Sequence, residues 1–207
     1  MSSSAPSRQS LPRTGPLSRR IVGAWHSAVL LSVLVGLAGC SSEPGPSRTS
    51  QPTVERNGAP TVDRPLDVTG IYGDPCSQLT RDERRTLAIV REGSSRSFLG
   101  DSECRWTSQG GDILALSVDR NRDLLADTYR ARALPVFLPV IVAGYPAVRE
   151  MTKIEDNNCV VTIGLGPEQA LRADWTGLGT YKPGDPDPCE RAETAAAMVI
   201  RKLPPQR

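Results

Sequence analysis

Histidine is almost absent from this chain of 207 residues, and its single copy is His26. His26 lies in the N-terminal segment that we expect to be removed on export, so we expect a mature protein without histidine. Such a chain cannot form a Ser-His-Asp or Cys-His catalytic set, a zinc site with imidazole ligands or a histidine pH switch. This absence excludes most common hydrolase mechanisms.

Two further absences narrow the function classes. No Cys-x-x-Cys pair occurs, so the adjacent thiolates of a typical structural zinc site are missing. A strong net charge is missing too, because residues 1–39 contain four arginines and no acid, and without them 21 basic side chains face 23 acidic ones. The basic character of the whole chain therefore comes from its N-terminus, and we expect no nucleic-acid partner.

The N-terminus itself has the pattern of an export signal. Arginines precede an apolar run over residues 28–37, which leads into Leu37-Ala38-Gly39-Cys40. This order is typical of a secretory signal, and the run is too short for a membrane span of about 20 residues. The last four residues resemble a lipobox, in which the cysteine is diacylated and becomes the new N-terminus. We therefore predict lipidation of Cys40 and a lipid-anchored location on the extracytoplasmic face of the cell membrane, with the secretory and twin-arginine routes both open.

Four cysteines remain after Cys40, namely Cys76, Cys104, Cys159 and Cys189. In an exported chain this number predicts two disulfides, for which three pairings exist. Elements that follow each other in sequence tend to be neighbours in space, which favours Cys76–Cys104 and Cys159–Cys189. The main alternative joins Cys76 to Cys189 and Cys104 to Cys159.

Composition divides the chain into three parts. Residues 1–39 form the predicted lipoprotein signal. Residues 40–66 are rich in serine, proline and glycine with little apolar periodicity, which predicts a disordered tether. Residues 67–207 are then long enough for one domain with a modest core.

Helix signals stand at both ends of this domain. The tripeptide Asp-Pro-Cys occurs at 74–76 and again at 187–189, and at both places it fits an N-cap followed by proline at the first helical position. A capping box at 80–83 predicts a short helix that ends at Gly93. The C-terminal helix is expected to stop before Pro204.

Between these helices the pattern is mostly that of strands. Residues 104–107 and 113–118 flank a turn with two glycines, which predicts a hairpin, and residues 124–132 fit a helix. Further strands are expected at 145–151, 159–163 and 170–175. This order of elements predicts an α+β fold, with an antiparallel sheet, helices packed on one face and two disulfides.

Several short motifs also connect the domain with a known family. They are Arg-Pro-Leu-Asp at 64–67, Asp-Pro-Cys-Ser-Gln-Leu-Thr at 74–80, Cys-Arg-Trp at 104–106, Gly-Tyr-Pro-Ala-Val at 144–148, Cys-Val-Val-Thr at 159–162 and Asp-Pro-Cys-Glu-Arg-Ala at 187–192. In this order they resemble the DUF3558 lipoproteins of actinobacteria over essentially the whole domain. The resemblance implies a secreted, lipid-anchored envelope protein of unestablished function, and it supplies no catalytic residues.

Residues 119–123 have the Asp-x-Asn-x-Asp spacing that begins an EF-hand loop. However, the sixth position is Leu124 instead of glycine, and the twelfth is Arg130 instead of glutamate. Two arginines inside the run also oppose a cation. We therefore expect a solvated turn between a strand and a helix, and no metal site.

The apolar stretch 134–142 allows two interpretations. It forms either the wall of a pocket or contact surface, or a core strand near the sheet edge, where its prolines need no ladder donor; the core interpretation is favoured. Trp106 and Trp175 are likewise either ligand-stacking or core residues, and the core is favoured. Serines 94, 95 and 97 lack the spacing of a nucleophile elbow, and nothing in the spacing supports a serine–lysine mechanism.

These observations favour a non-enzymatic binding or sensor-like module, with no catalytic residues, cofactor or metal. The expected partners are the membrane, through Cys40, and either an envelope protein or a small apolar ligand. Two alternatives stay open: an envelope-acting enzyme without histidine chemistry, and a structural or assembly subunit of an envelope complex. Acids clustered in a concave pocket would favour the first, and a large exposed apolar patch including Phe137 the second.

Overall fold

The computed structural model describes residues 56–98, 100–182 and 184–207, which all belong to a unit spanning residues 50–207. The helices are α1 (Thr69–Gly73), the 3₁₀ helix η1 (Pro75–Gln78), α2 (Arg81–Thr86), α3 (Leu124–Ala131) and α4 (Pro188–Ile200). The strands are β1 (Ser94–Phe98), β2 (Asp101–Thr107), β3 (Ile113–Asp119), β4 (Val136–Val142), β5 (Tyr145–Met151), β6 (Asn158–Gly166) and β7 (Gln169–Thr176).

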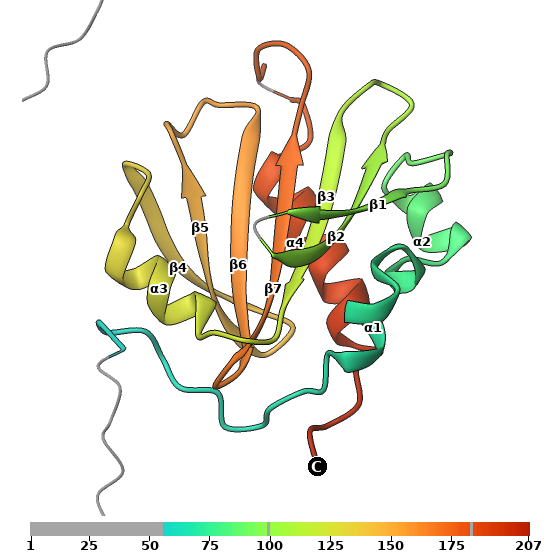
Figure 1. The fold of residues 1–207 in the computed structure, drawn as a ribbon. Helices are drawn as coiled ribbons and strands as arrows, with labels where there is room; N and C mark the ends of the chain where they lie inside the picture. Colours follow the sequence, from blue (N-terminus) through green and yellow to red (C-terminus); the bar gives the residue numbers. More distant parts are fainter. Residues whose placement is uncertain (1–55, 99, 183) are drawn as a thin grey trace, which may run out of the picture. The chain divides into compact units, whose positions relative to one another are not determined.

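The strands form one sheet in the order β1-β2-β3-β7-β6-β5-β4, and each neighbouring pair is antiparallel (Figure 1). This confirms the α+β class and the antiparallel sheet. The hairpin of β2 and β3 surrounds the predicted turn, and β5 has the predicted bounds. These elements were predictable because side chains of different character alternate along them with the two-residue period of a strand.

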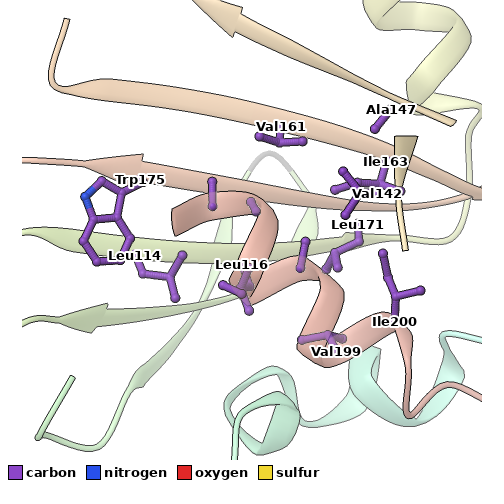
Figure 2. Packing of buried hydrophobic residues seen from close by; sticks show 14 of the residues in the cluster. Leu114, Leu116, Val142, Ala147, Val161, Ile163, Leu171, Trp175, Val199 and Ile200 are labelled. Carbon is purple, nitrogen blue, oxygen red and sulfur yellow. The ribbon is translucent and has the colours of Figure 1, made fainter. Parts of the chain in front are cut away.

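One face of the sheet forms the main hydrophobic core with α4. Figure 2 shows Val199 and Ile200 of this helix lying over Leu116 and Leu171 of the central strands, and all four are buried. The helix begins as predicted, with Pro188 at its first turn and the Asp187 side chain accepting bonds from the amides of residues 189 and 190. The sheet face under α4 is therefore closed by apolar packing.

The opposite face carries α3. Side chains alternate along β5, so Ala147 belongs to the core under α4, while its neighbour Val148 packs with Leu125 and Tyr129 of α3. Gly164 of β6 allows this approach, because a Cβ there would lie 2.9 Å from a methyl group of Leu125. We expected all helices to pack on one face of the sheet. This is correct for α1 and α4 but wrong for α3, which packs on the opposite face.

Polar contacts extend across the α3 face beyond the helix. Glu103 of β2 is buried and accepts bonds from Arg96 Nε at 2.5 Å and from the Ser117 hydroxyl at 2.9 Å. The register places Glu103 beside Ser117, and Ser117 beside Arg172 of β7. This face is thus lined by a row of charged and hydroxyl groups.

Both predicted disulfides are present. Cys76–Cys104 joins η1 to β2, and Cys159–Cys189 joins β6 to the first turn of α4, each with a Cα–Cα distance of 5.0 Å. Each bond ties a helix start to the strand beneath it. The alternative pairing of the two Asp-Pro-Cys cysteines is thereby excluded.

The predicted extent of the second helix is wrong. The capping box between Thr80 and Glu83 forms, but α2 ends at Thr86, because Ala88 adopts a positive φ of 57° and Ile89 forms a bridge with Ser108. Gly93 therefore ends no helix. It lies against the Cys104 sulfur and the Trp106 ring, where a Cβ would overlap both.

The tether prediction for residues 40–66 is wrong for residues 56–66. Ala59 packs in the cluster of α3, and Leu66 is buried in the core under α4 and forms a bridge with Pro205. Arg56 also pairs with Asp123. This segment can order because it covers apolar surface on both sides of the sheet. The rest of the predicted tether and signal lies outside the described residues.

Candidate functional site

A hollow of about 330 Å³ opens between α1, η1 and the C-terminal end of α4. Ile71, Val199 and Leu203 are the larger apolar side chains that line it. Ligand sites in proteins have volumes of about 300–1,000 Å³, with mostly apolar walls and a few polar groups. The hollow matches the lower end of that range.

Gln78 contributes the most unusual polar group of this hollow. The residue is 2% exposed, and neither Oε1 nor Nε2 of its side chain has a hydrogen-bond partner. Leaving a buried polar group without a partner costs about 1–3 kcal/mol, so native proteins seldom keep one. The amide can both donate and accept, and both of its polar atoms are buried behind the wall of the hollow.

The local sequence holds Gln78 firmly in place. Pro75 occupies the first position of η1, which fits its fixed φ angle, and Cys76 links the helix to β2. Leu79, the next residue, is buried in the core. Gln78 is therefore confined to the boundary between the hollow and the hydrophobic core.

Lys202 lines the hollow from the end of α4 and is exposed. Its Nζ donates to the backbone carbonyl of Gln78 at 2.5 Å and to Glu83 Oε2 at 2.7 Å. Burial acts to raise the pKa of Glu83, but the hydrogen bonds from Lys202 and Thr80 outweigh it and hold this pKa below its ordinary value. The charge of Lys202 is therefore already compensated by an ionised carboxylate.

Asp67 is the second charged residue of the hollow. Its carboxylate accepts a bond from the Thr69 amide at 2.8 Å, and bonds from the Thr69 side chain and amide lower the pKa of Asp67. With Lys202 balanced by Glu83, Asp67 gives the surroundings of the hollow a slight excess of negative charge.

A wider groove of about 830 Å³ adjoins the hollow, and Asp67 and Pro204 line both. The two residues are joined by a bond from the Asp67 amide to the Pro204 carbonyl at 2.9 Å. Gln169 lines the groove, but its Oε1 already accepts the Val68 amide at 3.0 Å, and Arg120 lies over the Tyr72 ring at 4.3 Å. The described polar contacts of the groove thus end on the protein itself, unlike the amide of Gln78.

Ser77 and Lys202 both line the hollow, but their hydrogen bonds go to other residues and they do not form a catalytic pair. The Ser77 hydroxyl donates to the Asp74 carbonyl at 2.8 Å, and Lys202 is held by Glu83. An ammonium group that is paired with a carboxylate is not available as a general base. Serines 94, 95 and 97 lie exposed on the edge strand β1.

The Asp-x-Asn-x-Asp run forms a turn between β3 and α3, as predicted. Asp119 accepts bonds from Arg122 and from the Asn121 amide, while Asp123 caps α3 through the Ala126 amide and pairs with Arg56. These carboxylates are occupied by protein groups. In the described part of the chain, no group of three or more histidine, cysteine or acidic side chains is placed to hold a metal ion.

The aromatic and apolar candidates divide between core and surface. Trp106 and Trp175 are both 1% exposed, which confirms the preference for core. The apolar stretch forms the edge strand β4, but Leu138 and Ile141 are exposed, so the favoured core assignment is wrong for them. Phe137 packs edge-on against Tyr129 with ring centroids 5.0 Å apart.

The predicted lipidation residue Cys40 lies outside the described residues. Within the described ranges, no helix is long and apolar enough to cross a membrane. Gln78 was not among the predicted site residues, although it belongs to the motif at 74–80. A glutamine in a polar motif gives no sign of burial, which depends on how α1, η1 and α4 meet.

The comparisons with known proteins support the resemblance seen in the motifs. The family model described as "Protein of unknown function (DUF3558)" matches residues 35–202. No curated protein and no solved structure matches the chain. Since the family model spans most of the 207 residues, the chain belongs to the DUF3558 family.

Proposed function

We propose that this protein is a lipid-anchored extracytoplasmic module that binds a small molecule in the hollow between α1, η1 and α4. The observation that carries the proposal is a hollow of about 330 Å³ whose larger lining side chains, Ile71, Val199 and Leu203, are apolar. Burial of an apolar molecule against such walls is favourable, and a volume of this size is typical of small-molecule sites.

The proposed anchor rests on Leu37-Ala38-Gly39-Cys40 after the apolar run. One cysteine with two acyl chains holds a protein stably at a membrane, whereas a single chain gives only marginal binding. Non-enzymatic binding is favoured because the nucleophile and base candidates that meet in the hollow, Ser77 and Lys202, are engaged by Asp74 and Glu83.

An assembly subunit is the second candidate, because β4 leaves one edge of the sheet open with Leu138 and Ile141 exposed. Ala143 and Gly144 form a two-residue turn, so the residues on either side of it, Val142 and Tyr145, exchange backbone hydrogen bonds. Hydrogen-bonded positions alternate along an antiparallel pair, and residues 137, 139 and 141 therefore point their backbone N–H and C=O groups away from β5. Residue 139 is proline, which removes the central donor and weakens this edge as a template for another strand.

The anchor is tested by intact-mass analysis of the membrane-extracted protein. We expect wild type to begin at Cys40 and to carry a diacylglyceryl group, and Cys40→Ser to lose both the lipid and lipoprotein-type cleavage. An unlipidated wild-type protein cleaved at another residue would contradict the proposed anchor.

The binding function is tested by native mass spectrometry of the lipidated protein, released gently from its own membrane. We expect a small-molecule adduct on wild type that is reduced in Leu203→Gln, which places a polar side chain on the apolar wall. Gln206→Met is the matched control, because Gln206 lines the neighbouring groove and not the hollow. An adduct-free wild type, or equal loss from both variants, would contradict binding in the hollow.

A further inference from the structure

We infer that the hollow and the groove beside it together bind an amphipathic molecule, with one apolar chain in the hollow and a zwitterionic head group in the groove. This inference rests on the proposed function and adds the chemical class of the ligand. It follows from three observations: the apolar walls of the hollow, the border that the two cavities share, and the separate charges of the groove.

The hollow has the walls and the size for an aliphatic chain. Ile71, Val199 and Leu203 provide branched apolar surface, and Ile71 and Leu203 are still partly exposed. A volume of about 330 Å³ corresponds to about ten water-sized groups at roughly 30 Å³ each, so a chain of about ten carbons fits. Because each buried methylene group strengthens binding by about fourfold, the chain supplies most of the affinity.

The hollow and the groove meet along one border. Asp67 and Pro204 line both cavities, and the bond from the Asp67 amide to the Pro204 carbonyl at 2.9 Å fixes this border. A molecule whose chain fills the hollow therefore has its next atoms beside Asp67. Its head group then lies in the groove, which at about 830 Å³ is the larger space.

The groove presents opposite charges that are kept apart. Arg120 and Glu168 are both exposed, and in the part of the chain that the structure describes neither forms an ion pair. Arg120 lies over the Tyr72 ring at 4.3 Å, which positions the guanidinium group without neutralising its charge. Asp67 and Glu168 balance Arg120 and Arg207, so a head group of one sign would be attracted by one pair and repelled by the other. A zwitterionic head group can interact favourably with both pairs.

Three probes with the same ten-carbon chain test the inference: decyl sulfobetaine, decyltrimethylammonium and decyl sulfate. The sulfobetaine carries both charges, with its ammonium group next to the chain, where Asp67 is the adjoining charge. The probes are titrated below micelle-forming concentrations into the lipidated full-length protein in nanodiscs. Ligand-observed NMR is the readout, and empty nanodiscs correct for partition into the lipid. We expect the sulfobetaine to bind more tightly than either ion by about threefold or more, a modest factor because exposed ion pairs are weak.

Two substitutions separate the chain from the head group. Leu203→Gln should weaken all three probes by a similar factor, because they share the chain. Arg120→Gln should weaken the sulfobetaine and decyl sulfate but not decyltrimethylammonium, whose undiminished binding shows that the variant is folded. Arg132→Gln is the matched control and should behave as wild type, because Arg132 is also exposed and lies over an aromatic ring, that of Phe137 at 4.7 Å, but lines neither cavity.

Equal affinity for the sulfobetaine and the two ions, tightest binding of one ion, or a sulfobetaine affinity that is unchanged in Arg120→Gln would overturn the inference. If no probe binds beyond the empty nanodiscs but the native adduct is present and depends on Leu203, the ligand class is wrong and the proposed function stands. If probes and native adduct are both absent, the proposed function fails as well.

Discussion

The two faces of the sheet are both covered by helices, but they are closed by different means. Under α4 the covering is apolar, with Leu116, Leu171 and Val199 in one continuous cluster. Beside α3 the sheet instead carries Glu103 and Ser117 in a hydrogen-bonded row. Burying a polar group without a hydrogen-bond partner among apolar side chains costs free energy. In a row of charged and hydroxyl groups, neighbouring polar groups can stabilise one another.

This difference gives the unpartnered polar atoms of the two faces different meanings. On the α3 face, Glu150 has one oxygen without a hydrogen bond, but Arg172 and nearby backbone amides still stabilise its charge. Near α4, Gln78 has no such help at either end of its amide. Trp106 Nε1, in the same core, also lacks a partner, so unmet polar atoms cost more stability on the apolar side.

The largest predicted contrast lies between two neighbours of β3 that face opposite sides. Leu116→Ala should lower the free energy of unfolding by about 3–5 kcal/mol, because it leaves a cavity in the core under α4. Ser117→Ala should cost about 1–2 kcal/mol, because it leaves Glu103 short of one hydrogen bond. Urea denaturation of both variants measures the contrast, and equal losses would show that the faces do not differ as described.

Removal of residues 56–66 should be costly, because this segment touches both faces. A chain that begins at Asp67 should be less stable by about 2–3 kcal/mol than one that begins at Arg56, since it loses the buried Leu66 and the contact of Ala59 with the α3 cluster. Thermal melting of the two truncated chains provides the measurement. Identical midpoints would restore the interpretation of this segment as a free tether.

Two glycines allow a comparison of close packing on the two sides. Gly93→Ala should cost about 2–3 kcal/mol, because its Cβ would overlap the disulfide sulfur of Cys104 and the Trp106 ring. Gly164→Ala should cost about 1 kcal/mol, because the Leu125 side chain of α3 can shift. Denaturant unfolding measures both variants. A larger loss of stability in Gly164→Ala than in Gly93→Ala would show that the surroundings of Gly164 are the more rigid of the two.

Ionised glutamates should affect stability with opposite sign in the two regions. Burial raises the pKa of Glu150 on the α3 face, so its ionised form costs stability at neutral pH, and this cost fades as the pH falls from the raised pKa to the ordinary pKa of a glutamate. The pKa of Glu83 beside the hollow is lowered, so its stabilising contribution is present at neutral pH and is lost on acidification.

Glu150→Gln should therefore raise stability at pH 7 by up to about 1 kcal/mol, and Glu83→Gln should lower it by about 0.5–1 kcal/mol. At pH 4 the difference of Glu150→Gln from wild type should vanish, whereas that of Glu83→Gln should persist in part, because a lowered pKa is titrated below the ordinary value. Denaturant unfolding at the two pH values measures them, and changes of the same sign at pH 7 would contradict the comparison.

The elements that could be predicted from the sequence have local signals. Thr80 with Glu83 and Asp187 with Pro188 mark helix starts through bonds within one turn, and the cysteines pair with elements close in sequence. The pairing of Cys159 with Cys189 could be predicted for this reason.

The remaining features depend on contacts between distant segments. Strand β1 is serine-rich and exposed along its length, so no alternation marks it. Ile141 is exposed because β4 lies at the edge of the sheet, and Gln78 is buried because α1, η1 and α4 meet around it. The periodicity of the sequence predicts neither arrangement. The candidate site could therefore not be predicted from the sequence, although Asp67 and Gln78 lie in two of the family motifs.

The stability of Gln78→Met without ligand tests the central claim most directly. Because the amide is buried on the apolar side without a partner, replacing it by a similar apolar side chain should raise the free energy of unfolding by about 1–3 kcal/mol, while Gln206→Met changes nothing. A loss of stability in Gln78→Met, measured by urea denaturation at neutral pH, would show that the amide serves the fold, and it would contradict the account.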